Sequence, residues 1–314
     1  MAVTEVHSIA PSKVWTVLLT TAAYLPGVLT LAHSLRLVGS AYPLIVLYTD
    51  SLPATALAAL KTRGIQTIKI TYIHPANAPT YAQDPRFRDC WTKLIVFSLT
   101  QFTRIVQLDA DMLVRQNMDE LMDLPLDTGA GAGAQPAMAA GHACVCNPLR
   151  KPHYPRDWTP ANCAFTTQHA SADAAQERAP ARDESKLRYL NGGLQVLEPS
   201  AARWAQIEQH MQTHAADMPF ADQSVLSDVF EDCWVPLPYV YNALKTMRWE
   251  GVHDAIWRDE RVKNMHYLLS PKPWDDEVDE NGKCLNRDPT HQWWVDTDHL
   301  RRAWERKNGI LDGL

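Results

Sequence analysis

The chain has 314 residues, 46% of them hydrophobic and 21% charged, and its formal net charge is −6. This composition is ordinary for a globular protein, and the negative charge gives no electrostatic reason to bind nucleic acid or an anionic membrane. The first 13 residues are polar and lack the basic start and apolar run of a signal peptide. The apolar stretch after them is interrupted by Thr20, Thr21, Tyr24, Pro26 and Gly27, so it is too short to span a bilayer. We therefore expect a cytoplasmic protein without a membrane or nucleic-acid partner.

The first half of the chain alternates between apolar strands and amphipathic helices. Strands are predicted at 14–19, 42–49, 65–73 and 104–108, and helices at 25–39, 52–64 and 90–102. Fully apolar strands separated by helices indicate an α/β fold with a mostly parallel central sheet and helices on both faces. Ligands of such sheets bind at the carboxyl ends of the strands. The first strand-to-helix turn has no G-x-G-x-x-G, which argues against a dinucleotide-binding dehydrogenase.

The second half is less regular. Small residues at 127–141 predict a flexible loop, and the polar stretch 167–186 predicts a loop or disorder. A strand is expected within 187–200, and helices at 202–215, 222–232 and 291–307. We expect the tryptophan-rich tail, 289–306, to pack on the core, with homodimer formation as the alternative. Without an internal repeat or a clear boundary, the sequence predicts a single domain over 1–314, with a core at 14–274 and an extension at 275–314.

The six cysteines do not form a recognisable disulfide framework, and a chain of this length does not need one. We expect reduced thiols, buried or in loops. Zinc binding by Cys144, Cys146 and Cys163 is the alternative, although C-x-C with one distant cysteine is a weak pattern.

The segment "LDADMLV", 108–114, holds the most informative polar residues. Residues i and i+2 of an extended segment point to the same face, which would place the carboxylates of Asp109 and Asp111 together at the end of an apolar strand. Two adjacent carboxylates repel each other unless a cation lies between them, and Mg²⁺ or Mn²⁺ in such a position usually bridges to substrate phosphates. D-x-D alone is also common in solvated acidic turns.

Downstream, "NMHYLLSPKPW" supplies His266 and Lys272. An imidazole beside two carboxylates favours Mn²⁺ over Mg²⁺, and a lysine would neutralise phosphate oxygens. Each residue alone is as compatible with a packed histidine or a solvated lysine. Together with Asp109 and Asp111, they predict a site for a metal ion and a diphosphate.

At this point the sequence resembles the retaining glycosyltransferases of family eight, the glycogenin and galactinol synthase family. The resemblance covers about residues 14–274. It rests on five ordered segments: "LLTTAAYLPGV", "WTKL" before the D-x-D, "YLNGGLQVLEP", "PFADQSVLSDVF" and "HYLLSPKPW". It implies a Rossmann-like nucleotide-diphospho-sugar transferase fold of the GT-A type.

The resemblance also implies roles for individual residues. Asp109, Asp111 and His266 would bind Mn²⁺, with Mg²⁺ as the alternative, and Lys272 would hold the diphosphate. The uracil and ribose of the donor would lie near Leu18, Thr20, Tyr24 and the backbone of Ala110. The donor sugar would contact Lys93, Asn191, Gly192, Asp222 and Gln223. The catalytic residues would be Asp222, Gln223 and Lys272.

Some positions depart from the family pattern. "LLSP" replaces a glycine that the family often has between His266 and Lys272, which puts one backbone contact to phosphate in doubt. Pro219 stands where glycogenin has a further aspartate. Trp249 falls where glycogenin has the tyrosine that it glucosylates, and tryptophan cannot accept a sugar. Together with "YNALKTMRW", this favours a galactinol-synthase-like protein over a glycogenin-like one.

The predicted function is Mn²⁺-dependent transfer of a hexose from UDP-galactose, or from UDP-glucose, to a hydroxyl of a small polyol or glycan, with retention of configuration. The first acceptor to consider is myo-inositol, and "CNPLRKPHYPRDWTP", 146–160, is expected to line the acceptor side. The alternatives are a glycogenin-like glucosyltransferase, a transferase to another glycan or polyol, a metal-dependent nucleotide-sugar hydrolase, and a non-catalytic UDP-sugar binding protein.

Overall fold

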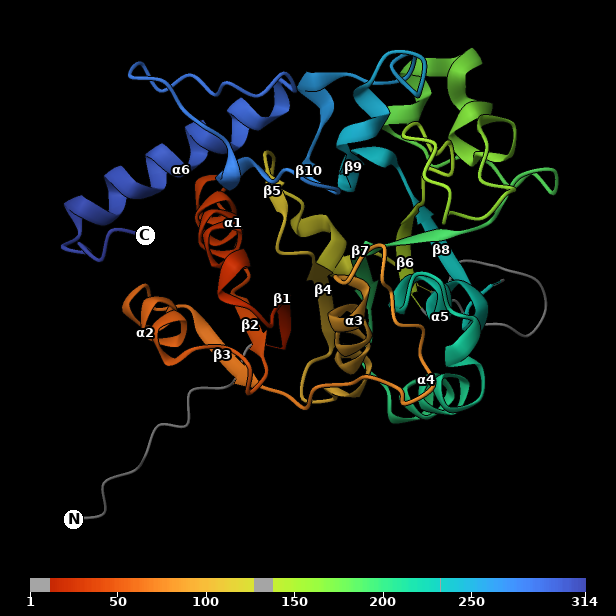
Figure 1. Cartoon of the computed structure of the whole chain (residues 1–314), viewed down its shortest axis with the longest axis horizontal. Helices are drawn as coiled ribbons and strands as arrows, with labels where there is room; N and C mark the ends of the chain where they lie inside the picture. Colours follow the sequence, from red (N-terminus) through yellow and green to blue (C-terminus); the bar gives the residue numbers. More distant parts are fainter. Residues whose placement is uncertain (1–11, 127–137, 232) are drawn as a thin grey trace.

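A computed structural model describes residues 12–126, 138–231 and 233–314, and its centre is a seven-stranded sheet (Figure 1). In spatial order the strands are β3 (Gln66–Lys69), β2 (Leu44–Tyr48), β1 (Lys13–Leu19), β4 (Arg104–Leu108), β7 (Leu190–Leu197), β6 (Met138–His142) and β8 (Trp234–Leu237). The strands β3, β2, β1 and β4 are parallel, whereas β7 runs antiparallel to both β4 and β6. The predicted α/β fold with a mostly parallel sheet is thus confirmed.

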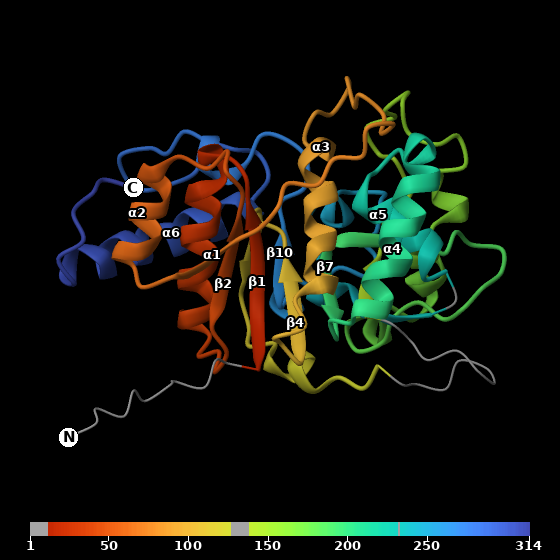
Figure 2. The same cartoon turned by 90° about the horizontal axis from the view of Figure 1, so that it is seen from below.

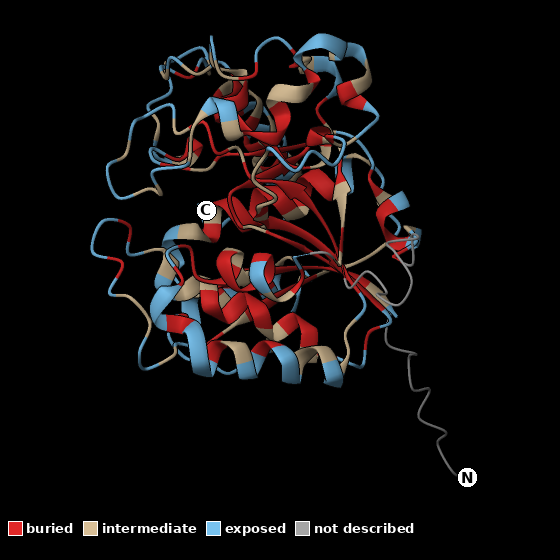
Figure 3. Cartoon of the chain, turned by 90° about the vertical axis from the view of Figure 1, so that its right-hand side faces the viewer, coloured by how far each residue is buried: buried red, intermediate tan, exposed pale blue. Residues whose placement is uncertain are grey.

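Helices cover both faces of this sheet (Figure 2). Side chains of β1 alternate between the faces, so that Val14 joins one hydrophobic cluster and Trp15 the other. One face packs against η2 (Trp91–Ser98), α4 (Ala201–His214) and α5 (Asp222–Val229), and the other against α1 (Leu25–Leu37) and α2 (Ala54–Thr62). Figure 3 shows the buried residues gathered in the central strands and on the inner sides of these helices.

A second, three-stranded sheet lies over the end of β4. It consists of β5 (Met112–Val114), β10 (Asn264–His266) and β9 (Ala243–Leu244). Strand β5 follows β4 after a three-residue connection and pairs antiparallel with β10, with His266 opposite Met112. The second sheet therefore brings a segment near residue 266 against the acidic pair that follows β4.

The C-terminal helix α6 (Thr290–Lys307) packs against α1 at the edge of the molecule. Thr30 donates a hydrogen bond to Asp298 (2.9 Å), and the guanidinium of Arg36 lies 3.9 Å from the ring centre of Trp304. Trp294 is buried, and Arg115 lies over the ring of Trp293. These tryptophans pack on the body of the protein, as predicted. In the described part of the chain, no helix is both long and apolar enough to cross a membrane.

Four local predictions differ from the structure. The predicted buried strand 65–73 is only Gln66–Lys69, and it is largely exposed because β3 is at the sheet edge. The predicted helix 90–102 is the short helix α3 (Phe87–Cys90) followed by the 3₁₀ helix η2. The loop prediction was wrong for 138–141, which belongs to the buried strand β6, while 127–137 lie outside the described residues. The polar stretch 167–186 was predicted as loop or disorder, but residues 167–176 belong to the 3₁₀ helix η5 (Ala164–Gln176).

Candidate functional site

A cavity of about 290 Å³ opens where β1 and β4 end and the second sheet begins. All of the residues predicted for the site line the cavity except Lys272, whose ammonium contacts the cavity-lining Asp111. The lining includes Leu18, Thr20, Tyr24, Lys93, Asp109, Ala110, Asp111, Asn191, Gly192, Asp222, Gln223 and His266. Segments far apart in the sequence thus meet at the carboxyl edge of the parallel strands, as parallel sheets of this kind lead one to expect.

Asp109, Asp111 and His266 form the centre of the site. One ligand atom from each lies within 4.8 Å of the others. Nε2 of His266 is 3.4 Å from Oδ1 of Asp111 and 3.8 Å from Oδ2 of Asp109. The two aspartates flank Ala110 in the turn between β4 and β5 and not in an extended strand, so the sequence argument placed them together for the wrong local reason. Two carboxylates and an imidazole make a donor set that suits a divalent transition metal.

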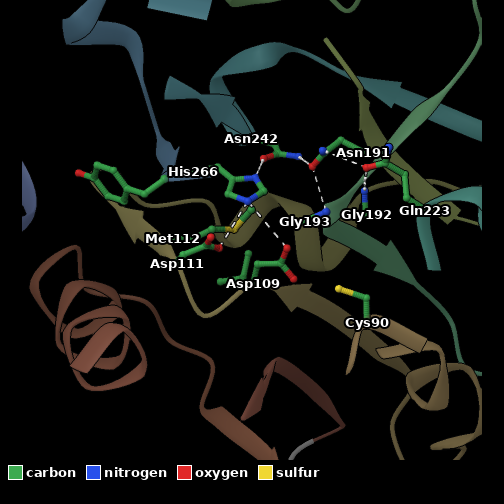
Figure 4. A network of polar contacts seen from close by, with 12 residues as sticks. Cys90, Asp109, Asp111, Met112, Asn191, Gly192, Gly193, Gln223, Asn242 and His266 are labelled. Atoms are coloured by element: carbon green, nitrogen blue, oxygen red, sulfur yellow. Dashed lines mark hydrogen bonds and ion pairs between the residues drawn. The ribbon is translucent and has the colours of Figure 1, made fainter. Parts of the chain in front are cut away.

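Two asparagines hold this histidine in place (Figure 4). Nδ1 of His266 lies 2.9 Å from Oδ1 of Asn242, so Nε2 faces the carboxylates. The amide of Asn242 in turn donates to Oδ1 of Asn191 (2.8 Å). Asn242 is buried and was not predicted for the site, since an asparagine in "YVYNALK" carries no sequence signal of its own. It links His266 to Asn191, which belongs to the segment expected to contact the sugar.

The backbone at Gly192 and Gly193 passes so close to these groups that side chains do not fit. A Cβ on Gly193 would lie 2.5 Å from Cε1 of His266, and a Cβ on Gly192 would lie 2.5 Å from Oδ2 of Asp222. Asp109 donates its backbone N–H to the carbonyl of Gly193 (2.9 Å), which fixes the acidic turn to β7. The two glycines of "NGG" are therefore required by close approach.

Lys272 lies behind the acidic pair. Its ammonium is paired with Asp111 and donates to the carbonyl of Tyr267 (2.8 Å). Burial works to raise the pKa of Asp111, but Lys272 and His266 together hold that pKa well below its usual value. Asp111 is therefore ionised at neutral pH. In this structure Lys272 neutralises the carboxylate of Asp111, and a diphosphate would have to compete with that carboxylate for the lysine.

Lys93 occupies the opposite side of the acidic turn. Its ammonium is 3.0 Å from Asp109 and 2.8 Å from Asp222, and it donates to the carbonyl of Gly192 (3.3 Å). Burial raises the pKa of Asp222 to about 6, against the opposing effect of Lys93. Next to Asp222, Oε1 of Gln223 accepts hydrogen bonds from the side-chain amide of Asn191 (3.2 Å) and from the backbone N–H of Gly192 (3.3 Å).

The first strand and its turn form another wall. Thr20 donates to Asp89 (2.6 Å), and burial raises the pKa of Tyr24 to about 12, so this phenol is neutral. Arg86 also lines the cavity and is paired with Asp84. Sequence reasoning missed Arg86, because nothing in "DPRFRDC" separates it from a solvated surface arginine.

The segment from Asn147 to Trp158, part of the stretch 146–160 that was expected to line the acceptor side, closes the remaining side of the cavity. Pro148, Leu149, Lys151, Tyr154 and Trp158 of this segment line the cavity. Trp158 stacks on Phe220, with ring centres 4.6 Å apart and planes inclined by 15°, and Tyr154 meets both rings edge-on. An aromatic wall beside polar groups is typical of pockets that bind small molecules.

A similar fold is found in solved glycosyltransferases. The galactosyltransferase LgtC, solved with donor and acceptor sugar analogs, matches 95% of this chain and all of its own chain with a TM-score of 0.57 and 17% identity. GlyE of Streptococcus pneumoniae TIGR4 matches 95% of this chain and 64% of its own, with a TM-score of 0.57 and 15% identity. The fold is that of the GT-A glycosyltransferases.

Sequence comparison places the chain in a particular family of that class. The profile of Glycosyl transferase family 8 matches residues 15–278, and the chain belongs to this family. Galactinol synthase 1 of Ajuga reptans is 29% identical over 253 residues, which are 80% of this chain and 70% of the relative. Galactinol synthase 4 of Arabidopsis thaliana is 26% identical over 272 residues, 86% of this chain and 76% of the relative. The protein is therefore a family 8 glycosyltransferase whose sequence is similar to proteins named galactinol synthases.

Proposed function

We propose that this protein transfers a hexose, first of all galactose, from a UDP-sugar to a hydroxyl group of a small polyol or glycan. The observation that carries the proposal is the convergence of Asp109, Asp111 and His266, with Lys272 behind them, at the carboxyl edge of the sheet. The similarity to proteins named galactinol synthases favours galactose over glucose and makes myo-inositol the first acceptor to test.

Mn²⁺ is the metal that suits the three ligands best, because imidazole nitrogen is a poorer ligand for Mg²⁺. The hydrogen bond from His266 to Asn242 leaves Nε2 to face the metal position, and Lys272 and Lys93 offset the charge of the carboxylates. A bound Mn²⁺ would act as a Lewis acid toward the diphosphate of the donor. Leu18, Thr20, Tyr24 and the backbone of Ala110 would hold uracil and ribose, and Asn191, Gly192 and Gln223 the sugar.

In the proposed reaction, the bond between the anomeric carbon and the β-phosphate oxygen breaks, and its electron pair leaves with UDP. The acceptor oxygen attacks from the same face, so the configuration is retained, and its proton passes to a departing phosphate oxygen. A double displacement would instead need a carboxylate beside the anomeric carbon. Asp222 is the available candidate, but its carboxylate is paired with Lys93 and its Oδ2 lies against Gly192. We therefore assign Asp222 to binding and orientation of the sugar.

The test is release of UDP with Mn²⁺ from UDP-galactose and UDP-glucose, each with and without myo-inositol. We expect release from UDP-galactose to rise strongly when myo-inositol is added. Asp111→Asn should abolish it, whereas Asp217→Ala, at an exposed position in the 3₁₀ turn η6 (Ala215–Asp217) after α4, should leave it unchanged. If the protein prefers UDP-glucose, the transferred sugar is glucose and not galactose. If another polyol or glycan accelerates the release and myo-inositol does not, that compound is the acceptor.

Two results would overturn the proposal. Release that no acceptor accelerates, with free hexose as the product, would make the protein a nucleotide-sugar hydrolase. Tight binding of UDP without turnover for any donor would make it a binding protein.

Asp222→Asn distinguishes the two routes to retention. A trapped or rescuable glycosyl-enzyme intermediate would identify Asp222 as a nucleophile, and a moderate loss of rate would support its role in orientation.

A further inference from the structure

A second group of metal-ligating side chains lies beside the cavity but apart from the acidic site. It consists of Cys144, Cys146, Cys163 and His253. One ligand atom of each lies within 4.8 Å of every other. Cys146, Cys163 and His253 are buried, and Cys144 is partly buried. The first two cysteines follow β6, the third precedes η5, and the histidine comes from a turn about 90 residues later in the chain.

The distances fit a tetrahedral zinc site. The sulfurs of Cys146 and Cys163 lie 3.2 and 3.3 Å from Nε2 of His253. Zinc bonds of ~2.3 Å to sulfur and ~2.0 Å to nitrogen at tetrahedral angles separate these two ligand types by about 3.5 Å. The sulfurs of Cys146 and Cys163 need to move by only a few tenths of an ångström relative to Nε2 of His253 to reach this geometry.

The histidine is oriented for such a role. Nδ1 of His253 lies 2.9 Å from Nε2 of His169, on η5. A proton on Nδ1 donated to His169 would leave a lone pair on Nε2, which faces the sulfurs. Histidines that bind metals are commonly fixed in this way by a hydrogen bond from their other ring nitrogen.

The chemistry of the four side chains selects the ion. Three thiolates and one imidazole, without a carboxylate, are ligands for zinc and not for Mg²⁺ or Mn²⁺. Four protein ligands close the coordination sphere, which is the pattern of a structural and not a catalytic zinc. A disulfide would use only two of the three thiols, and all three cysteines are free in the structure.

We propose that Cys144, Cys146, Cys163 and His253 bind one Zn²⁺ ion that holds the segment 147–158, which lines one wall of the cavity, in place. The segment between Cys146 and Cys163 carries the cavity-lining residues Pro148, Leu149, Lys151, Tyr154 and Trp158. Its regular structure is limited to one 3₁₀ turn, η4 (Pro160–Asn162). Zinc would fasten both ends of this segment and join them to His253. This proposal does not depend on the sugar-transfer reaction.

The primary experiment is metal analysis of the full-length protein, purified with a reducing agent and without a chelator. We expect one zinc per chain, and X-ray absorption should show three sulfurs at ~2.3 Å and one nitrogen at ~2.0 Å. Protein that contains no zinc, and takes up none when refolded with excess Zn²⁺, would overturn the proposal. So would a disulfide among the three cysteines in protein isolated without added reductant, or zinc bound by oxygen ligands.

Variants then assign the ligands. Cys163→Ser should lose the zinc, whereas Cys233→Ser, which precedes β8 and packs against a different hydrophobic cluster from Cys163, should keep it. Asp111→Asn should also keep it, which separates this site from the acidic one. If Cys163→Ser does not fold, the partly buried Cys144→Ser offers a milder change, and it should weaken zinc retention against a competing chelator. Trypsin should cleave after Arg150 or Arg156 several-fold faster in the zinc-free protein, and an unchanged rate would contradict the role of the ion in the wall.

Discussion

Asn242 is the residue whose contribution is easiest to isolate, because it touches the proposed metal site only through His266. Its side chain joins Nδ1 of His266 to Asn191, and it is itself buried. We expect Asn242→Ala to raise the Mn²⁺ concentration needed for half-maximal UDP release by about 10- to 100-fold, since loss of such an orienting partner typically weakens metal binding by this factor.

The matched control for this prediction is Asn117→Ala. Asn117 donates to the carbonyls of Val38 and Gly39 at the other end of α1, far from the acidic turn. It should leave the Mn²⁺ dependence unchanged. If Asn242→Ala also shows the wild-type dependence, His266 does not need this hydrogen bond for metal binding.

A second residue-scale prediction concerns Gly193. A Cβ there would lie 2.5 Å from Cε1 and 2.7 Å from Nδ1 of His266, both in a buried ring that cannot easily move. Gly193→Ala should therefore displace the imidazole and reduce Mn²⁺-dependent activity by at least about tenfold, which corresponds to ~1.4 kcal/mol. Gly141→Ala is the control, because its added Cβ would meet its nearest atom at an ordinary 3.5 Å. Equal activity of the two variants would show that the site tolerates a shifted histidine.

The segment 147–158 lines one wall of the cavity, and its effect on the two substrates can be measured separately. Trp158 stacks on Phe220 and lines the cavity, while the predicted donor contacts come from other elements. We expect Trp158→Ala to raise KM for the acceptor by about tenfold, from the loss of apolar area and ring contact, and to change KM for the UDP-sugar little. Trp158→Phe should recover most of the loss. A change in the donor KM alone would place the tryptophan on the donor side.

Helix α6 is held to the rest of the chain by buried charges as well as by tryptophans. Arg301 bonds to Asp298 (2.7 Å) and to Glu305 (2.7 Å), and Glu305 also pairs with Arg63 on the other side of the interface (2.8 Å). Removing one member of a buried network leaves the others without a partner. We expect Arg301→Met to lower the free energy of unfolding by about 3 kcal/mol. Asp123→Ala, which breaks the surface pair with Lys13, should cost less than about 1 kcal/mol.

The same network predicts a dependence of stability on pH. Burial works to raise the pKa values of Asp298 and Glu305, but the neighbouring arginines hold both below their ordinary values. Acids with lowered pKa values stabilise the folded state above the unfolded values, near pH 4, and lose this stabilisation as the pH falls through the folded ones. The melting temperature should therefore fall less steeply between pH 7 and pH 3 for Arg301→Met than for the wild type. Parallel curves would mean that other carboxylates dominate acid unfolding.

At the scale of the whole molecule, the sequence predicted the parts of the fold that local periodicity determines. The strands β1, β2 and β4 and the helices α1, α2, α4, α5 and α6 were expected close to where they lie, because their apolar patterns are long and regular. Strand β6 was missed, since "MAAGH" is short and consists mainly of small residues, and its strand character comes from pairing with β7 and β8. The antiparallel direction of β7 likewise depends on long-range pairing.

The residues of the candidate site likewise divide into those that the sequence could predict and those that it could not. Motif residues such as Asp109, Asp111 and His266 carry a recognisable chemistry, and the fold brings them together. Asn242 and Arg86 carry no such signal, and only their positions identify them. His253 shows the same difficulty for the proposed zinc site, because it lies about 90 residues from the nearest cysteine of the group and belongs to no ligand motif. Spacing in the sequence could not connect residues that meet only in the folded chain.

The contacts across the molecule lead to a prediction about its cooperativity. We propose that 1–314 is a single domain, since α6 near the C-terminus packs on α1 and bonds to Arg63 beside α2, both near the N-terminus. Strand β10 pairs with β5, which joins the two halves a second time. The N-terminal half therefore cannot complete its own packing without the last helix. Tryptophan fluorescence and far-UV circular dichroism should follow one coincident unfolding transition in urea.

Deleting 290–314 tests the same proposal from the other direction. It would expose the face of α1 that α6 covers and would leave Arg63 without Glu305 and Asp312. We expect the truncated protein to be insoluble or to unfold at a clearly lower urea concentration in both optical signals, because a buried apolar face and a buried arginine are uncovered together. Two separate transitions in the intact chain, or a truncated chain with the wild-type midpoint, would instead make the C-terminal extension an independent unit.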